Sequence, residues 1–61
     1  MILSASQKLE AVERELKLRR RVYPSLILRG RMKQSFADLQ VAIFESIADD
    51  YRRQTETERL I

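Results

Sequence analysis

Residues 17–33 read KLRRRVYPSLILRGRMK and contain both residues that can interrupt a helix, the chain's one proline and its one glycine. Pro24 removes a backbone hydrogen-bond donor and disfavours the helical conformation at the residue before it. Gly30 suits the left-handed position that follows the end of a helix. The segment also carries seven basic residues and no acidic one. It therefore predicts a turn between two helical arms, and this turn is strongly basic.

The arm before the turn has the periodicity of an amphipathic helix. Apolar residues recur at spacings of four and three, and Arg19 fills one place in a row that comprises Ala5, Leu9, Val12, Leu16, Tyr23 and Leu26. Ser4 followed by Gln7 has the form of a capping box. We therefore predict a helix over about residues 4–29. Pro24 leaves two alternatives, a kinked continuous helix or a break near residues 23–24; because Leu26 keeps the heptad frame, the kinked continuous helix is favoured.

The arm after the turn is a second amphipathic helix, predicted over about residues 34–53. One apolar row comprises Phe36, Leu39, Ile43, Ile47 and Tyr51, and a second comprises Ala37, Val41, Phe44 and Ala48. The last residues, 54–61, show no convincing apolar face, so we expect a frayed tail there. Two helices with a short connection predict an all-α fold, an antiparallel helical hairpin that forms a single domain over residues 1–61.

A hairpin of this size is close to the lower limit for independent folding. The chain has 61 residues and no cysteine, so it has no disulfide that could stabilise it. Each arm carries an apolar arc that is wider than one partner helix can cover. We therefore expect the hairpin to dimerise into a four-helix assembly, or to cover its apolar surplus with another protein.

The composition excludes several kinds of site. Because histidine and cysteine are both absent, a zinc site and a histidine-based catalytic triad are not expected. Tyr23 and Tyr51 fall on apolar rows, with nothing nearby to adjust their acidity. We expect no enzymatic activity, no metal and no cofactor. No apolar run approaches the length of a membrane span, so we expect a cytoplasmic protein of a bacterial host cell.

Charge is unevenly placed along the chain. Residues 1–33 hold nine basic and three acidic residues, whereas residues 34–61 hold three basic and six acidic residues. The basic residues expected to contact a partner are Arg14, Lys17, Arg19, Arg20, Arg21, Arg29 and Arg31. The apolar residues expected to contact a partner or a second copy are Leu18, Val22, Ile27, Val41 and Phe44.

About two-thirds of the chain resembles a group of small helical proteins encoded in phages and prophages of proteobacteria. The matching elements are VERELKLRRRVYP at residues 12–24, Gly-Arg-Met at 30–32, Ala-Asp at 37–38 and Asp-Tyr at 50–51. The chain departs from the group at Lys33, where a capping serine or threonine is usual, and at Gln40, where an acid is usual. The resemblance implies a phage origin and implies no activity.

Two functions follow as expectations. The first is a phage-encoded protein-binding module that inhibits or modulates a host or phage protein by occlusion, for example an anti-CRISPR-like inhibitor of a host-defence complex. The alternative is a nucleic-acid-binding accessory protein that contacts the phosphate backbone through its basic arm. A helix-turn-helix is disfavoured because the exposed residues of the second helix include acids, which repel phosphate.

Overall fold

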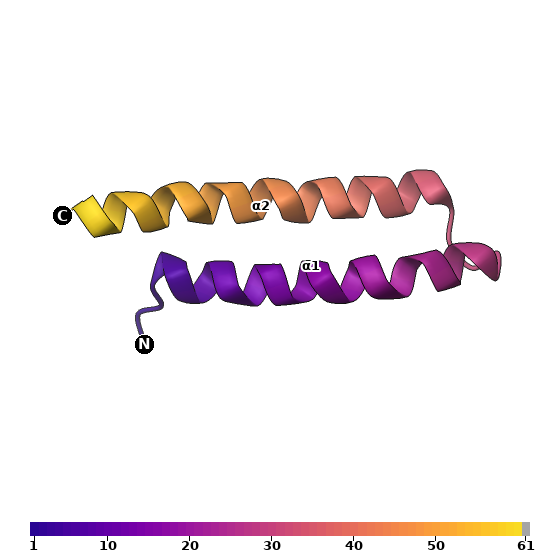
Figure 1. Cartoon of the computed structure of the whole chain (residues 1–61), viewed down its shortest axis with the longest axis horizontal. Coiled ribbons are helices and arrows are strands. Elements are labelled where there is room, and N and C mark those ends of the chain that lie inside the picture. Colours follow the sequence, from indigo (N-terminus) through magenta and orange to yellow (C-terminus); the bar gives the residue numbers. More distant parts are fainter. Residues whose placement is uncertain (61) are drawn as a thin grey trace.

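The computed structural model describes residues 1–60 and contains two helices and no strand in that range. Helix α1 is Ala5–Leu28 and helix α2 is Gln34–Leu60. Figure 1 shows the two helices side by side and antiparallel, joined at one end by a short turn, with the start of α1 and the end of α2 at the other end. The predicted all-α helical hairpin is confirmed.

Helix α1 begins at the predicted capping box. The N–H of Gln7 donates to Ser4 Oγ at 3.1 Å, and the N–H of Ser4 donates to Gln7 Oε1 at 2.9 Å. The carboxylate of Glu58, from the end of α2, accepts a further hydrogen bond from the N–H of Ala5 at 3.3 Å. These contacts satisfy N–H groups that the first turn leaves free, and a negative charge is favourable at this end of the helix dipole.

Helix α1 continues through Pro24, so the alternative of a break near residues 23–24 does not occur. Proline cannot donate the hydrogen bond that would reach the carbonyl of Arg20. Both residues are exposed, so water can satisfy that carbonyl. The neighbouring Tyr23 is 8% exposed and holds this part of α1 against α2.

The turn ends α1 with the hydrogen bonds of a Schellman motif. The N–H of Gly30 donates to the carbonyl of Ile27 at 3.0 Å, and the N–H of Arg31 donates to the carbonyl of Leu26 at 2.9 Å. Gly30 has a φ of +71°, a conformation that residues with a side chain rarely adopt. The glycine therefore terminates the helix as predicted, with Arg29 as the C-cap residue.

Helix α2 starts at the predicted residue and ends later than predicted. It extends to Leu60, so residues 54–60 are helical rather than frayed, and only residue 61 of the predicted tail lies outside the described range. Thr55 is buried against α1, and its Oγ1 donates to the carbonyl of Tyr51 at 2.8 Å. Because its hydroxyl is satisfied within the helix, this threonine can occupy a core position. The bond from Ala5 to Glu58 holds the last turns in place.

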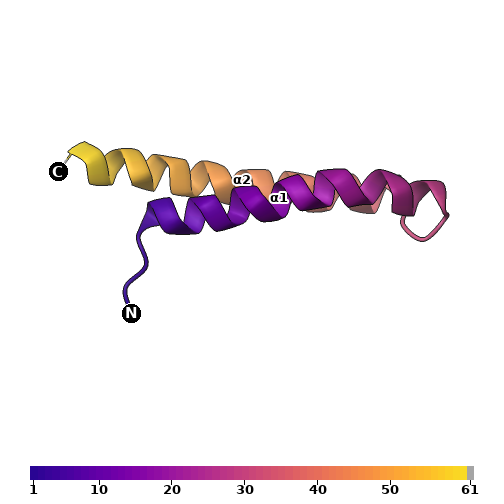
Figure 2. The same cartoon turned by 60° about the horizontal axis from the view of Figure 1, so that its bottom comes forward.

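The core is one row of side chains from each helix. Its buried members are Ala5, Leu16 and Tyr23 from α1 and Ala37, Ala48 and Thr55 from α2. Half of them are alanines, so the row buries little apolar surface. The helices cover only each other, which Figure 2 shows from a second direction.

The hairpin is thin for its mass. Its extents are 48 × 19 × 16 Å, and its accessible surface is 5093 Å². A compact monomer of 7.2 kDa exposes about 4,100 Å². The hairpin therefore leaves about 1,000 Å² more surface in water than a globular chain of this mass.

Candidate functional site

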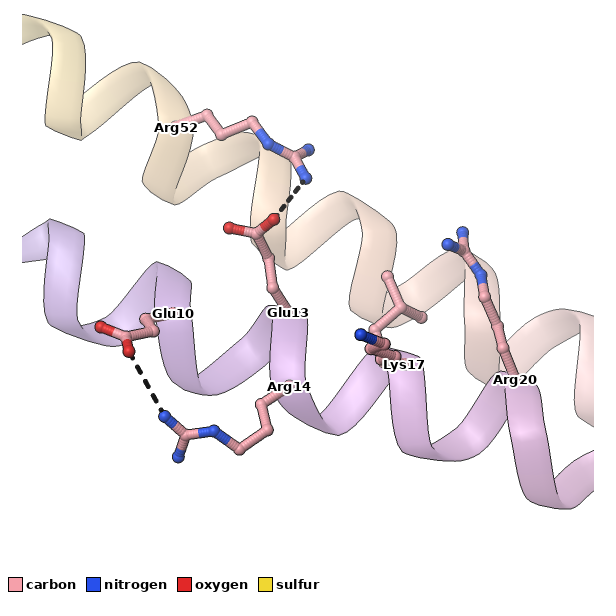
Figure 3. A pocket seen from close by; sticks show the side chains of 7 residues that line it. Glu10, Glu13, Arg14, Lys17, Arg20 and Arg52 are labelled. Atoms are coloured by element: carbon pink, nitrogen blue, oxygen red, sulfur yellow. Dashed lines mark hydrogen bonds and ion pairs between the residues drawn. The ribbon is translucent and has the colours of Figure 1, made fainter.

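Two ion pairs link the helices along one edge of the hairpin, which we call the ion-pair edge. Arg20 pairs with Glu45, and Glu13 pairs with Arg52 at 3.6 Å. Figure 3 shows the second pair, and shows Arg20 reaching up alongside α2. All four side chains are about half exposed, so each pair stabilises the hairpin by about 1 kcal/mol or less. Arg20, one of the predicted partner contacts, is thus engaged within the chain.

Arg19 lies over the core, where it contacts both helices. Its Nε donates to Glu15 Oε1 at 2.9 Å, and its Nη1 donates to Tyr23 Oη at 2.6 Å. The guanidinium stacks over the ring of Phe44, with Cζ 4.2 Å from the ring centre. The hydrogen bond with Tyr23 raises the pKa of Arg19, with smaller contributions from Glu15, while desolvation opposes the rise. Arg19 therefore joins the helices instead of facing a partner.

Of the other basic residues predicted to contact a partner, only Arg14 forms an ion pair within the described residues. Arg14 pairs with a glutamate one turn earlier at 3.5 Å, as Figure 3 shows. Among residues 1–60, no ion pair involves Lys17, Arg21, Arg29 or Arg31. Lys17 and Arg21 are exposed on α1, and Arg29 and Arg31 are exposed at the turn. We call these four residues the basic surface.

Large apolar side chains are exposed on the edge opposite the ion-pair edge. Their exposed fractions lie between 39% and 51%, and we call them the apolar face: Leu18, Val22, Phe36 and Ile43. Leu39 is also exposed, but it lies one heptad before Ser46, on the outer side of α2. Large apolar side chains exposed on one edge of both helices are typical of a surface that binds another protein. This face is therefore the strongest candidate for a contact surface.

Helix periodicity places both halves of the apolar face on the same edge. Val22 follows Arg20 by two residues, which is about 200° of rotation round α1. On α2, Ile43 stands two residues before Glu45, so the same rotation of about 200° separates them, now counted towards the N-terminus. Because the helices are antiparallel, both rotations lead from the ion-pair edge to the opposite edge of the hairpin.

The five apolar residues predicted for partner contact divide among three places. Leu18 and Val22 belong to the apolar face. Ile27 and Val41 line a shallow groove on the ion-pair edge. Phe44 is half-buried beneath a guanidinium, where it belongs to the helix–helix contact.

Of the two apolar rows of α2, the one that contains the alanines faces α1. Ala37 and Ala48 are buried against α1, whereas Phe36 and Ile43 from the other row are exposed. Small side chains let two helix axes approach closely, so the alanine row faces α1. The two alanines were the sequence signal for this choice, and Phe36, Leu39 and Ile43 were missed as surface residues.

No group of three or more acidic, histidine or cysteine side chains in residues 1–60 could hold a metal ion. Neither α1 nor α2 combines the length and the apolar character that crossing a membrane requires.

Comparison with known proteins gives no match: no family model, no curated protein and no solved structure is significantly similar to this chain. The basic surface and the apolar face are therefore the features from which we infer a function.

Proposed function

We propose that this chain is a small protein-binding module, which dimerises through its apolar face and acts by covering a surface of a host or phage protein. The observation that carries the proposal is the apolar face itself, which α1 and α2 together leave without a covering element. Apolar area of this kind is removed from water when a protein binds, and its burial is the main driving force of association.

The small core also favours association, because it can contribute little to the stability of the fold. The buried apolar residues number five, and three of them are alanines. Domains of about 60 residues are marginally stable, and small natural domains often add disulfides, a metal or association to what such a core supplies. Since the chain has no cysteine, association is the available source of further stabilisation.

The basic surface gives the partner a charge preference. Lys17, Arg21 and Arg31 are exposed cations, and within residues 1–60 no acid pairs with them. Cations at the rim of a contact increase the association rate with an acidic surface and disfavour basic partners. We therefore propose an acidic protein surface as the partner.

The resemblance to phage and prophage proteins supports a phage origin and hence a partner inside the bacterial host cell. Occlusion of a host-defence complex, as an anti-CRISPR-like inhibitor, is one such function, and it needs no catalytic residue.

We also propose that α1 bends at Pro24, because the hydrogen bond lost at the carbonyl of Arg20 favours bending there.

Binding of nucleic acid is the second candidate, and the unpaired cations of the basic surface favour it. Two contacts weaken it. Arg19 and Arg20 are engaged by Glu15 and Glu45, so the arginine run offers fewer free charges than its sequence suggests. No row of exposed aromatic side chains is available on the described helices to stack with bases.

Affinity capture from host lysate, with and without nuclease, tests the proposal. Tagged wild-type protein is compared with Arg21→Glu and with the control Arg59→Glu, which changes the net charge equally at the end of α2. We expect one stoichiometric protein partner that resists nuclease, is lost with Arg21→Glu and is kept with Arg59→Glu. Recovery of no stoichiometric partner contradicts the proposal, and capture that disappears with nuclease favours nucleic-acid binding instead.

A further inference from the structure

We propose that the apolar face of one hairpin packs against the same face of a second copy, with the two hairpins antiparallel. The inference rests on the proposed function, because it names the orientation and the contacts of the dimer. In this arrangement α1 packs on α1 of the other copy, and α2 packs on α2. The order of apolar and charged residues along each helix supports it.

On α2, the row that contains Phe36 and Ile43 of the apolar face has the same spacing in both directions. Phe36, Gln40, Ile43 and Ile47 follow one another at spacings of four, three and four, which makes a second heptad row beside the core row. The midpoint of this row lies between residues 41 and 42. Reversing the helix about that midpoint places Phe36 opposite Ile47 and Gln40 opposite Ile43. The spacing of the row is therefore symmetric in an antiparallel pair, with Gln40 as its one polar member.

Opposite charges flank this row at equal distances from its midpoint. Lys33 stands three residues before the row, and Asp50 stands three residues after it. In an antiparallel pair, Lys33 of each copy lies level with Asp50 of the other copy. Both residues are exposed; in the described range Lys33 forms no ion pair, and Asp50 contacts only Arg53, on its own helix.

On α1, the charges indicate a second midpoint. Glu15 lies seven residues before Val22, and Arg29 lies seven residues after it, so all three share one edge of the helix. An antiparallel pair centred on Val22 brings this residue against its copy and Glu15 level with Arg29 of the other copy. Arg29 is free of ion pairs within residues 1–60.

The two midpoints lie at the same height in the hairpin. Arg19 contacts Phe44, so these two residues lie at about the same height. Because the helices are antiparallel, Val22, three residues after Arg19, lies level with residue 41, three residues before Phe44. The contact between Ala5 and Glu58 follows the same alignment. One twofold axis therefore satisfies the α1 pairs and the α2 pairs together.

The opposite orientation, with both turns at the same end, places like charges together. In that arrangement α1 of one copy packs on α2 of the other. Arg29 then lies level with Lys33, and Glu15 lies close to Asp50, so both charged positions repel. Facing like charges disfavour a contact, whereas opposite charges specify its register.

The hairpin is large enough for such a dimer. It is 48 Å long and 16–19 Å across, so one long side has room for the roughly 800 Å² that stable interfaces bury from each partner. Lys17 and Arg21 line one groove with Leu18 and Glu15, so they lie at the rim of this contact. In this arrangement Arg29 contacts the second copy and is no longer available to another protein. Each end of the dimer carries one basic turn.

Charge reversal distinguishes the two orientations by the sign of its effect. Asp50→Lys places two lysines together in the antiparallel dimer, so we expect its dimer dissociation constant, measured by sedimentation equilibrium, to rise roughly tenfold. The double variant Lys33→Asp, Asp50→Lys restores the pair and returns the constant to about the wild-type value. A tighter dimer with Asp50→Lys alone would overturn the antiparallel arrangement.

Cysteine cross-linking gives a second, geometric test, and the chain has no native cysteine to interfere. Val22→Cys lies on the proposed axis, so mild oxidation should link two chains through this position. Ser46→Cys, on the exposed outer side of α2, is the matched control and should stay unlinked. Because a disulfide needs Cα atoms within about 7 Å, the parallel arrangement does not permit the Val22→Cys link.

The outcomes separate this inference from the proposed function. A dimer that fails to link at Val22→Cys overturns the orientation and leaves the proposed function intact. An antiparallel dimer that captures no protein partner supports the inference and contradicts the proposed function. A monomer at all concentrations contradicts both.

Discussion

Among single residues, Arg19 contributes contacts that no other side chain type could reproduce. It occupies a core position, donates to Glu15 and Tyr23, and covers the ring of Phe44 with its planar end. A lysine keeps the charge but has neither the plane nor the fixed fork of donors. The hydrogen bond with Tyr23 raises the pKa of Arg19 above its already high ordinary value, so this stabilisation is complete near neutrality and is lost only in strong alkali.

Arg19→Lys should therefore lower the urea concentration at the midpoint of unfolding, and Arg19→Met should lower it further because it also removes the charge. The measurement is urea unfolding followed by circular dichroism at one fixed protein concentration. Arg14→Lys is the matched control, since the pair of Arg14 with Glu10 is exposed and adds little. A midpoint for Arg19→Lys equal to that of Arg14→Lys would show that the contacts of Arg19 do not hold the helices together.

At the scale of the helices, two features differ from what the helix propensities of the residues predict. Helix α1 accommodates Pro24 in its interior, and α2 extends to the start of α1 through Thr55 and Glu58. In both places, contacts with the other helix outweigh a local preference to end. Tyr23 holds the proline turn against α2, and the cap on Ala5 holds the last turns of α2.

Pro24→Ala should stabilise the hairpin by about 1–3 kcal/mol, because alanine restores the hydrogen bond to the carbonyl of Arg20 and suits a helix interior. Urea unfolding measures the change, with Ser25→Ala as the control for an exposed substitution one residue away. Destabilisation by Pro24→Ala would mean that α1 does not run through this position as a regular helix.

Removal of residues 54–61 should lower the stability of the hairpin, although these residues have no apolar face of their own. The truncation deletes Thr55 from the core and Glu58 from the N-terminus of α1. Removal of residues 60–61 is the matched control and should leave the melting temperature nearly unchanged. If both truncations melt at the wild-type temperature, the end of α2 does not pack on α1 in solution.

The hairpin, its turn and the start of both helices could be predicted from the sequence because their signals are local. Gly30, the capping box at Ser4 and the heptad spacing of α1 each specify a nearby backbone conformation. The choice between the two apolar rows of α2 could not be predicted in the same way. It depends on how closely the helix axes approach, which is a property of both helices together.

The end of α2 was missed for a related reason. Thr55 continues the core spacing after Ala48 and Tyr51, but its hydroxyl marks it as polar until the bond to the carbonyl of Tyr51 is known. Among the candidate site residues, Arg19 was recognised as turning towards the core, whereas the bond from Arg20 to Glu45 needed the alignment of the two helices.

As a whole molecule, the hairpin buries few large side chains and exposes many. Its core row holds three alanines beside Leu16 and Tyr23, whereas Val22, Phe36 and Ile43 are exposed on the apolar face. Association through that face therefore supplies burial that the fold alone lacks, and the stability of the protein should depend on its concentration. Function and folding are coupled in this account, since the same surface serves both.

The molar mass in solution tests this coupling most directly. Light scattering on a sizing column, at micromolar concentration, should give twice the 7.2 kDa of one chain. Ile43→Glu places a charge in the apolar face and should give 7.2 kDa, whereas Ser46→Glu on the outer side of α2 should keep the doubled mass. A wild-type mass of 7.2 kDa with a stable, fully helical fold would contradict the account.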